Sequence, residues 1–221
     1  MIDGDDTLWE NNIYFEAALE RFIDFLDHSQ LTREKVREAV AEIEKLNIAR
    51  HGYGSKAFAR NLELAYESLR EDNLRESDAQ ALLALAGEIM DHELEILPGV
   101  APTLAELSLR NDLILFTKGE PTEQQFKVER SGLAHHFQQV VITPEKDVAA
   151  YRDLVRRHSL DAERTWMVGN SPRSDINPAL QAGLGAVLVP HPRTWSLELA
   201  EVASGPRLLI LDRFEELLRH F

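Results

Sequence analysis

Residues 1–7 read MIDGDDT, and the rest of the chain is best interpreted outward from this stretch. Asp3, Asp5 and Asp6 crowd around a single glycine and are followed by Thr7. The two apolar residues in front of them have the character of the end of a buried strand. In open parallel sheets, ligands bind at the carboxyl ends of the strands, so this cluster lies where chemistry is expected.

The composition is that of a globular protein with a sizeable core. The chain has 221 residues, of which 44% are hydrophobic and 28% charged, enough for one large domain or a core with a smaller unit. It has no cysteine, which excludes disulfides and thiolate metal sites. There is no apolar run of the roughly 18 residues that span a membrane, and no signal peptide. We therefore expect a soluble, cytoplasmic protein.

The charge is strongly acidic. With 24 basic and 38 acidic residues, the formal net charge is -14. Such a charge repels nucleic acid and acidic membrane surfaces, so neither is an expected partner. It also repels an anionic small substrate, whose site would need local positive charge or a metal ion. The eight histidines show no metal-ligand spacing, and we assign none of them a role.

The segment 12–95 has the pattern of a helical bundle. Phe15, Leu19, Phe22 and Leu26 recur at helical spacing, which predicts one buried helix face. Three more helices are predicted in this segment, at residues 31–46, 55–69 and 76–94.

Cap signals precede two of these helices. Thr32 is a plausible cap for the helix at 31–46, and Ser77 with Gln80 has the spacing of a capping box.

From residue 96 onward, short apolar runs alternate with helical patterns. The predicted strands are residues 113–117, 140–143, 165–169, 186–190 and 207–211, and the predicted helices are 102–110, 122–132, 145–158, 175–183 and 214–221. This alternation predicts an α/β fold with a parallel sheet and crossover helices.

These two patterns predict a discontinuous core. An α/β unit that starts at residue 1 is interrupted by about 85 residues of helices, far more than an ordinary connection. We therefore expect a core of residues 1–11 and 96–221 and a helical domain of residues 12–95, which would cover the edge of the sheet as a lid.

The predicted strand ends carry polar residues that should converge at one edge of the sheet. Those residues are Asp3, Asp5, Thr117, Lys118, Lys146, Asn170, Ser171 and Asp175.

Four short motifs together resemble the haloacid dehalogenase superfamily of hydrolases. The family's first motif is matched by DGDDT at 3–7, and its second, a Thr or Ser ending an apolar strand, by LILFT at 113–117. Its third motif, a lysine before a helix, is matched by Lys146, and its acidic fourth motif in part by GNSPRSD at 169–175. The resemblance implies a Rossmann-like parallel-sheet core with an all-helical cap domain inserted after the first strand.

For a phosphatase of this family, the first motif supplies two carboxylates with different tasks. Asp3 would be the nucleophile that forms an aspartyl-phosphate, which divides one difficult hydrolysis into two easier steps. Asp5, two residues further along a strand, should point to the same face. It would protonate the leaving oxygen and later deprotonate the attacking water.

The other motifs would hold the phosphoryl group and the family's Mg²⁺. The expected metal ligands are Asp3, the main-chain carbonyl of Asp5, and Asn170 or Asp175 in the fourth motif.

Three further residues of the core motifs complete the predicted site. Lys146 would balance charge on the nucleophile, and Thr117 and Lys118, with the backbone N–H groups there, would bind phosphoryl oxygens.

Two features depart from the family pattern. Asn170 stands where the family commonly has an aspartate, so the metal should be held less tightly or Asp175 should take over more of the task. Only Met1 and Ile2 precede Asp3, whereas a central strand usually needs about five residues. We therefore expect that the chain as given lacks most of its first strand.

The substrate must be selected outside the core motifs, which contact only the phosphoryl group. Residues 49–60 are the least helix-like part of the insert, and Tyr53 and Lys56 there offer an aromatic face and positive charge. They would suit a small phosphorylated metabolite under a closing lid. A plain turn with solvated basic residues is the alternative interpretation.

Other functions remain open at this point. A haloacid dehalogenase is disfavoured by Asp5, because a halide leaving group needs no acid. A phosphate-accepting receiver module would not carry so large a helical insert. A catalytically weak member that binds a ligand or partner is compatible with Asn170. The oligomeric state is expected to be monomer or homodimer.

Overall fold

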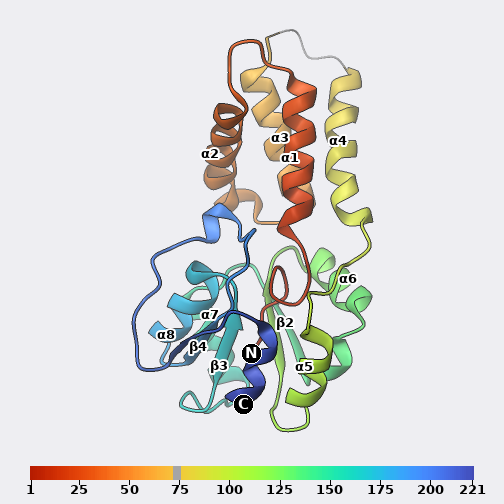
Figure 1. The fold of residues 1–221 in the computed structure, drawn as a ribbon. Helices are drawn as coiled ribbons and strands as arrows, with labels where there is room; N and C mark the ends of the chain where they lie inside the picture. The colour runs from red at the N-terminus through yellow and green to blue at the C-terminus, as the bar shows by residue number, and fades with distance from the viewer. Residues whose placement is uncertain (72–75) are drawn as a thin grey trace. The chain divides into compact units, whose positions relative to one another are not determined.

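The computed structural model describes residues 1–71 and 76–221, with only the backbone of residues 76, 77, 79 and 86. The capping box predicted at Ser77 therefore lies outside the described side chains. The chain divides into one unit of Met1–Asn12 and Leu94–Phe221 and a second unit of Ile13–Glu93. The first holds the strands and the second is helical (Figure 1).

The helical unit is built around one apolar core. Its helices are α1 (Asn12–Leu26), α2 (Arg33–His51), α3 (Ser55–Leu69) and α4 (Glu76–Asp91). Phe22, Val40 and Leu62 are fully buried there, and Phe15, Leu19 and Leu26 pack against them. The predicted apolar face of α1 is thus confirmed. The cap at Thr32 is also confirmed, because its side chain accepts a hydrogen bond from the N–H of Lys35.

The stretch 49–60 is more helical than the sequence predicted. α2 continues to His51 and α3 begins at Ser55, so the turn is limited to Gly52–Gly54. Gly52 and Gly54 have φ angles of 66° and 105°, in the region that favours glycine. The two glycines therefore form a short turn between two long helices and do not mark an irregular loop.

The first unit contains parallel strands, as predicted. They are β1 (Ile114–Lys118), β2 (Gln139–Thr143), β3 (Trp166–Gly169), β4 (Gly185–Leu188) and β5 (Leu208–Ile210). β1 pairs with β2, and β3, β4 and β5 form a second parallel group in that order.

The first three residues join these two groups of strands. Ile2 forms parallel bridges to Leu115 of β1 and to Val168 of β3. The N–H of Ile2 donates to the carbonyl of Ile114 over 2.8 Å, and the N–H of Asp3 donates to the carbonyl of Val168 over 2.9 Å. The spatial order is therefore β2, β1, residues 1–3, β3, β4, β5. Asp3 thus lies at the end of the central position of the sheet.

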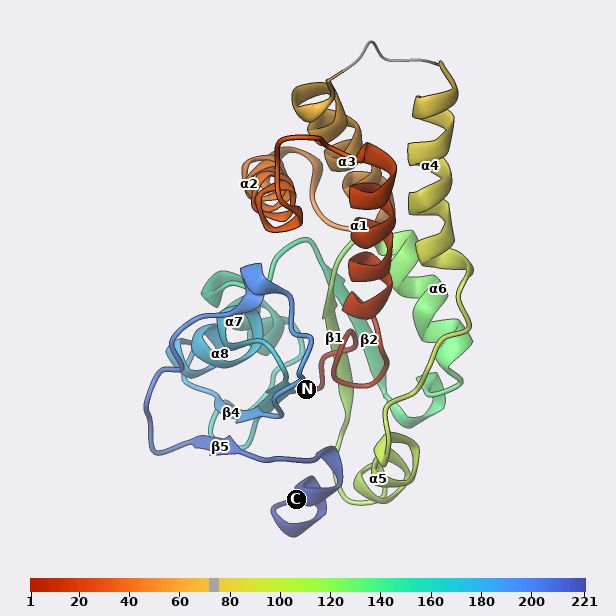
Figure 2. The same cartoon turned by 45° about the horizontal axis from the view of Figure 1, so that its top comes forward.

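Helices cover both faces of the sheet (Figure 2). They are α5 (Val100–Leu107), α6 (Pro121–Ser131), α7 (Val148–Arg157) and α8 (Asn177–Gln181). Leu115 packs in one core cluster with Leu104 of α5, whereas its neighbour Phe116 packs in another with Tyr151 of α7. Successive strand residues point to opposite faces, so each strand contributes to both clusters. The core is a Rossmann-like α/β fold.

Three helix boundaries differ from the prediction. α7 begins at Val148 with Asp147 as its cap, so Lys146 lies before the helix and not within it. The predicted helix at 175–183 is shortened to α8 because residues 172–176 form a wider turn, and the last helix is a 3-10 segment, Phe214–Arg219. Within residues 1–71 and 76–221, no helix has the length and apolar composition needed to cross a membrane.

Candidate active site

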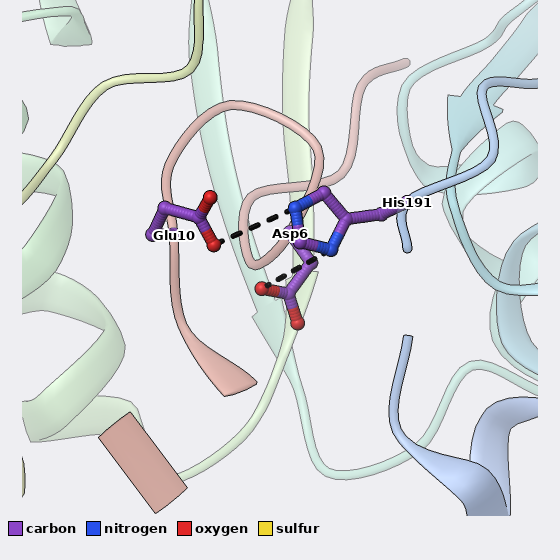
Figure 3. A group of neighbouring side chains, drawn as sticks. All are labelled: Asp6, Glu10 and His191. Atoms are coloured by element: carbon purple, nitrogen blue, oxygen red, sulfur yellow. Dashed lines mark ion pairs between the residues drawn. The ribbon is translucent and has the colours of Figure 1, made fainter. Parts of the chain in front are cut away.

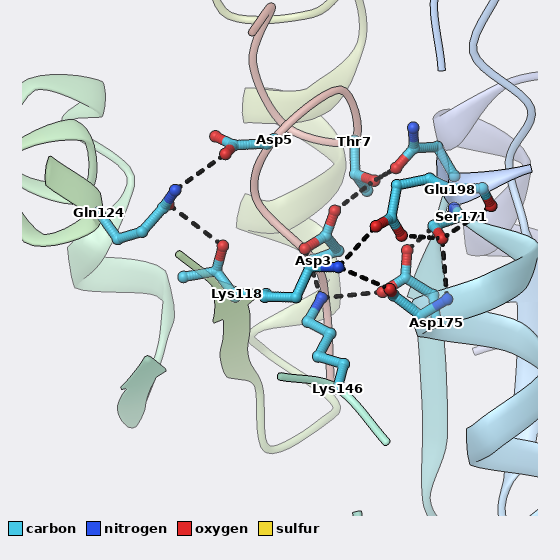
Figure 4. Close-up of polar contacts among 12 residues, drawn as sticks. Asp3, Asp5, Thr7, Lys118, Gln124, Lys146, Ser171, Asp175 and Glu198 are labelled. Carbon is cyan, nitrogen blue, oxygen red and sulfur yellow. Dashed lines mark hydrogen bonds and ion pairs between the residues drawn. The ribbon is translucent and has the colours of Figure 1, made fainter. Parts of the chain in front are cut away.

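Strand ends that lie far apart in the sequence bring three charged side chains into contact (Figure 4). The Nζ atom of Lys146 lies 2.5 Å from Oδ1 of Asp3 and 2.8 Å from Oδ1 of Asp175. All three residues are buried, with Asp175 only 1% exposed. Two carboxylates therefore share one ammonium group in a site that excludes most water.

This sharing leaves negative charge that is not fully balanced. Burial and, to a smaller extent, the carboxylate of Asp175 raise the pKa of Asp3 to about 7, although Lys146 acts to lower it. Burial acts to lower the pKa of Lys146, but its two carboxylate partners outweigh it and hold this pKa above its usual value. The lysine is therefore charged, and the ionised group of three carries one net negative charge.

Thr7 and Asn170 extend this group on the side of the first motif. The hydroxyl of Thr7 lies 3.2 Å from Oδ2 of Asp3 and 3.2 Å from Oδ1 of Asn170, with one proton to donate between them. Carboxylate and amide oxygens of the first and fourth motifs thus converge around one hydroxyl.

The donor set fits a hard divalent cation. Asp3 and Asp175 offer carboxylate oxygens and Asn170 offers an amide oxygen, and oxygen ligands are those that Mg²⁺ prefers. Burial is the largest cause of the raised pKa of Asp3, and the carboxylate of Asp175 adds to it; a cation would neutralise the negative charge that the single lysine leaves unbalanced. Three of the predicted metal ligands, Asp3, Asn170 and Asp175, therefore lie around Thr7 and Lys146, and their chemistry suits the metal.

Asp5 faces away from this group, contrary to the expectation of a shared face. The chain leaves the extended conformation after Asp3, because the N–H groups of Thr7, Leu8 and Trp9 all donate to the carbonyl of Gly4. This tight loop turns the carboxylate of Asp5 toward α6 (Figure 4).

Three donors hold the Asp5 carboxylate. Trp9 Nε1 donates to its Oδ1 over 2.7 Å, and Gln124 Nε2 donates to its Oδ2 over 2.9 Å. Nζ of Lys127 lies 2.8 Å from both oxygens. Burial acts to raise the pKa of Asp5, but the ion pair with Lys127 and the hydrogen bonds outweigh it and lower this pKa. Asp5 is therefore ionised at neutral pH.

Gln124 and Lys127 were missed by sequence reasoning. They lie one turn apart on α6, and the amide of Gln124 also accepts a hydrogen bond from Thr117 over 3.2 Å. Gln124 thereby links the second motif to Asp5. Its position in the first turn of the helix after a strand was a usable signal, since that turn faces the carboxyl edge of the sheet.

Lys118 was predicted to bind substrate, but its ammonium is tied to protein groups. It lies 2.6 Å from Oε1 of Glu198, 2.9 Å from Oγ of Ser174 and 3.4 Å from Glu145. Glu198 also accepts a hydrogen bond of 2.6 Å from Ser171. Glu198 lies beyond β4 in a segment without a motif, so nothing in the sequence pointed to it.

A histidine for which no role was predicted lies beside two acidic residues of the first-motif loop (Figure 3). His191 Nδ1 is 3.9 Å from Oδ1 of Asp6, and its Nε2 is 3.5 Å from Oε2 of Glu10. Burial raises the pKa of Asp6 to about 7, although the N–H groups of Asn11 and Asn12 donate to it. The segment after β4 is thus held against the first motif.

The remaining predicted residues belong to the helical unit. Tyr53 is half-buried in the turn between α2 and α3, and Lys56 is exposed in the first turn of α3. They are not among the residues gathered at the strand ends of the first unit.

Comparison with known proteins gives relatives with phosphatase and dehalogenase names. A glyceraldehyde 3-phosphate phosphatase of Methanothermobacter thermautotrophicus is 26% identical over 200 residues, covering 85% of this chain and 83% of the relative. A haloacid dehalogenase-like hydrolase of Xanthomonas campestris superimposes with a TM-score of 0.86 at 28% identity, over 99% of this chain and 89% of that one. A 2-haloacid dehalogenase of Pseudomonas syringae shares the fold, with a TM-score of 0.62 at 24% identity over 99% and 95%.

The family of haloacid dehalogenase-like hydrolases matches residues 1–183, which include all four motifs. This match agrees with the parallel order of the strands and with the Asp3, Lys146 and Asp175 group at their ends. The chain belongs to the haloacid dehalogenase-like hydrolases.

Proposed function

We propose that this hydrolase is a Mg²⁺-dependent phosphatase that cleaves small phosphate monoesters through a phosphorylated Asp3. The single observation that carries the proposal is the buried group of Asp3, Lys146 and Asp175, in which two carboxylates share one lysine. The phosphatase names of relatives support it.

In the first step, a carboxylate oxygen of Asp3 attacks phosphorus as the bond to the leaving oxygen breaks. Lys146 keeps Asp3 in place and offsets charge on the phosphoryl oxygens. Thr117 supplies a hydroxyl at the end of β1, with the backbone N–H groups of the loop that follows. Mg²⁺, held by Asp3, Asn170 and Asp175, would offset the repulsion between carboxylate and phosphate.

Asp5 moves the protons in both steps. It gives a proton to the leaving oxygen, and it then takes one from the water that attacks the aspartyl-phosphate, which releases phosphate and restores Asp3. The ionised Asp5 seen beside Lys127 is the form that accepts a proton. To act on the leaving oxygen, it must first take up a proton from solvent and give up its bonds with Lys127 and Gln124.

A phosphoenzyme measurement tests the proposal. Acid quench during turnover of p-nitrophenyl phosphate, followed by peptide mass spectrometry, should find phosphate on Asp3. Turnover should require Mg²⁺, and Asp3→Asn should lose it. An adduct on another residue, or full activity in Asp3→Asn, contradicts the proposal. Release of halide from 2-chloropropionate without phosphatase activity would instead establish the dehalogenase alternative.

The substrate proposal concerns the turn between α2 and α3. Tyr53 and Lys56 would recognise the non-phosphoryl part of a small phosphorylated metabolite, which an acidic protein attracts only through local positive charge. Lys56→Ala should then raise KM for the preferred metabolite much more than for p-nitrophenyl phosphate. Arg60→Ala is a matched control, because Arg60 is on the same helix but is paired with Glu63. An equal change in KM for both substrates would contradict a role in substrate recognition and would favour the interpretation of this segment as a plain turn.

A further inference from the structure

Asn170 can serve a cation in only one of its two amide orientations. A carboxylate presents an oxygen whichever way it is turned, whereas an amide presents either an oxygen or an NH₂ group that repels a cation. A protein that places asparagine at this position therefore needs a means of fixing the amide.

Thr194 provides that means. Its hydroxyl proton is donated to the carbonyl of His191 over 3.0 Å. The oxygen of Thr194 can then only accept, and it accepts from Nδ2 of Asn170 over 2.9 Å. The NH₂ group therefore faces Thr194, and Oδ1 faces Thr7 and the Asp3 carboxylate.

The position of Thr194 is itself fixed by the first-motif loop. The ring of His191 lies between the carboxylates of Asp6 and Glu10 (Figure 3). The side chain of Asn12 donates to the carbonyl of Arg193 over 2.8 Å. The segment His191–Thr194 is thus attached to the loop that follows Asp3. Through Thr194 it fixes the position of the Asn170 side chain relative to Asp3.

The two candidate ligands of the fourth motif differ in how their oxygens are used. Asp175 Oδ1 lies 2.8 Å from Lys146, and its Oδ2 accepts from the N–H of Ser171 over 3.0 Å. Among the described side chains, the hydrogen-bond partner of Asn170 Oδ1 is the Thr7 hydroxyl, which it shares with Asp3. The oxygen of Asn170 is therefore the more available of the two.

We propose that Thr194 is a positioning residue that turns the Asn170 amide so that its oxygen binds the divalent cation. This inference rests on the proposed function for the presence of the cation, and it assigns Thr194 no contact with substrate. Partners that orient a metal ligand commonly contribute 10- to 100-fold to metal affinity, so the effect should be measurable directly.

The test is calorimetric titration of the full chain with Mg²⁺ in the absence of substrate. Thr194→Val, which keeps the shape and removes the hydroxyl, should weaken Mg²⁺ binding by about 10- to 100-fold. Thr194→Ser should retain the affinity. Thr165→Val is the matched control, because the Thr165 hydroxyl donates to the carbonyl of Asp161 within its own loop. Thermal unfolding checks that each variant folds. If Thr194→Val does not fold, Thr194→Ala takes its place in the titration.

The decisive comparison repeats the titration in an Asn170→Asp background. A carboxylate needs no orientation, so loss of the Thr194 hydroxyl should there change Mg²⁺ affinity by less than about twofold. Unchanged affinity in Thr194→Val, or an equal loss in both backgrounds, overturns the inference. Wild type that binds no Mg²⁺ overturns the inference and the proposed cofactor together. Wild type that binds Mg²⁺ but hydrolyses no phosphate ester rejects the phosphatase alone and leaves the positioning role intact.

Discussion

Asp3 and Asp5 are two residues apart in the sequence and lie in opposite electrostatic surroundings. Asp3 shares Lys146 with a second carboxylate, Asp175, and its pKa is raised to about 7 by burial and by that neighbour. Asp5 pairs with Lys127, which also donates to the amide oxygen of Asn11, and accepts hydrogen bonds from two further side chains; its pKa is lowered.

The difference between these centres indicates which one is suited to a further cation. The Asp5 centre is balanced by protein groups alone, one carboxylate with one ammonium. The Asp3 centre is short of one positive charge, which is the deficit that a divalent ion would reverse. The two carboxylates are thus prepared for different tasks by their neighbours on other strands and helices.

The largest expected difference between the two centres is in stability after loss of the lysine. Lys146→Met leaves two buried carboxylates facing each other and should cost about 3–5 kcal/mol at neutral pH. Lys127→Met leaves a partly exposed carboxylate with two other donors, and should cost about 1–3 kcal/mol. Urea unfolding of both variants in EDTA measures this, and equal losses would remove the distinction between the centres.

The second effect is on turnover. Asp5→Asn should reduce turnover of an alkyl phosphate by at least about 10²-fold while substrate still binds, because proton transfer is lost and the Asp3 centre is untouched. On an ester with a very good leaving group, formation of the phosphoenzyme should recover but its hydrolysis should not. Steady-state and single-turnover kinetics separate the two steps. Unchanged turnover of the alkyl phosphate would refute the acid role.

The smallest effect is on the pH dependence of stability. In the folded protein the pKa of Asp3 is about 7, above its ordinary value of 3.8, so between these two pH values the folded protein binds more protons than the unfolded chain. Its contribution to stability therefore falls as pH rises from about 4 to 7. Asp3→Asn removes this fall and should gain on the order of 1 kcal/mol over wild type between pH 5 and pH 8, without metal. A constant difference across that range would mean that Asp3 is ionised throughout.

The sequence was sufficient to predict where the polar residues that follow the strands would lie. Asp3, Thr117, Lys146 and Asp175 follow recognisable apolar runs, and parallel strands bring their carboxyl ends to one edge wherever the intervening chain travels. The placement of these residues at that edge could therefore be predicted from order alone.

The residues that act through these side chains could not be predicted in the same way. Gln124 and Lys127 look like the polar face of an ordinary helix, and only the rotation of α6 against the sheet directs them to Asp5. Thr194 and Glu198 lie in an irregular segment after β4, whose path no periodic pattern records. The contact of Lys118 with Glu198 could not be predicted for the same reason, since the two residues are 80 residues apart.

The insertion of residues 1–3 between β1 and β3 also has a consequence for how the molecule forms. Residues 1–3 pair with β1 and β3, which follow them in the chain only after the whole helical unit. Contacts of such sequence separation form slowly, because a long loop must close before they stabilise anything. Helices α1 to α4 pack against neighbours that are nearer in the sequence, so they can assemble before the sheet closes. We therefore expect closure of the sheet to be a late event in folding, and it is the same event that delivers Asp3 to Lys146.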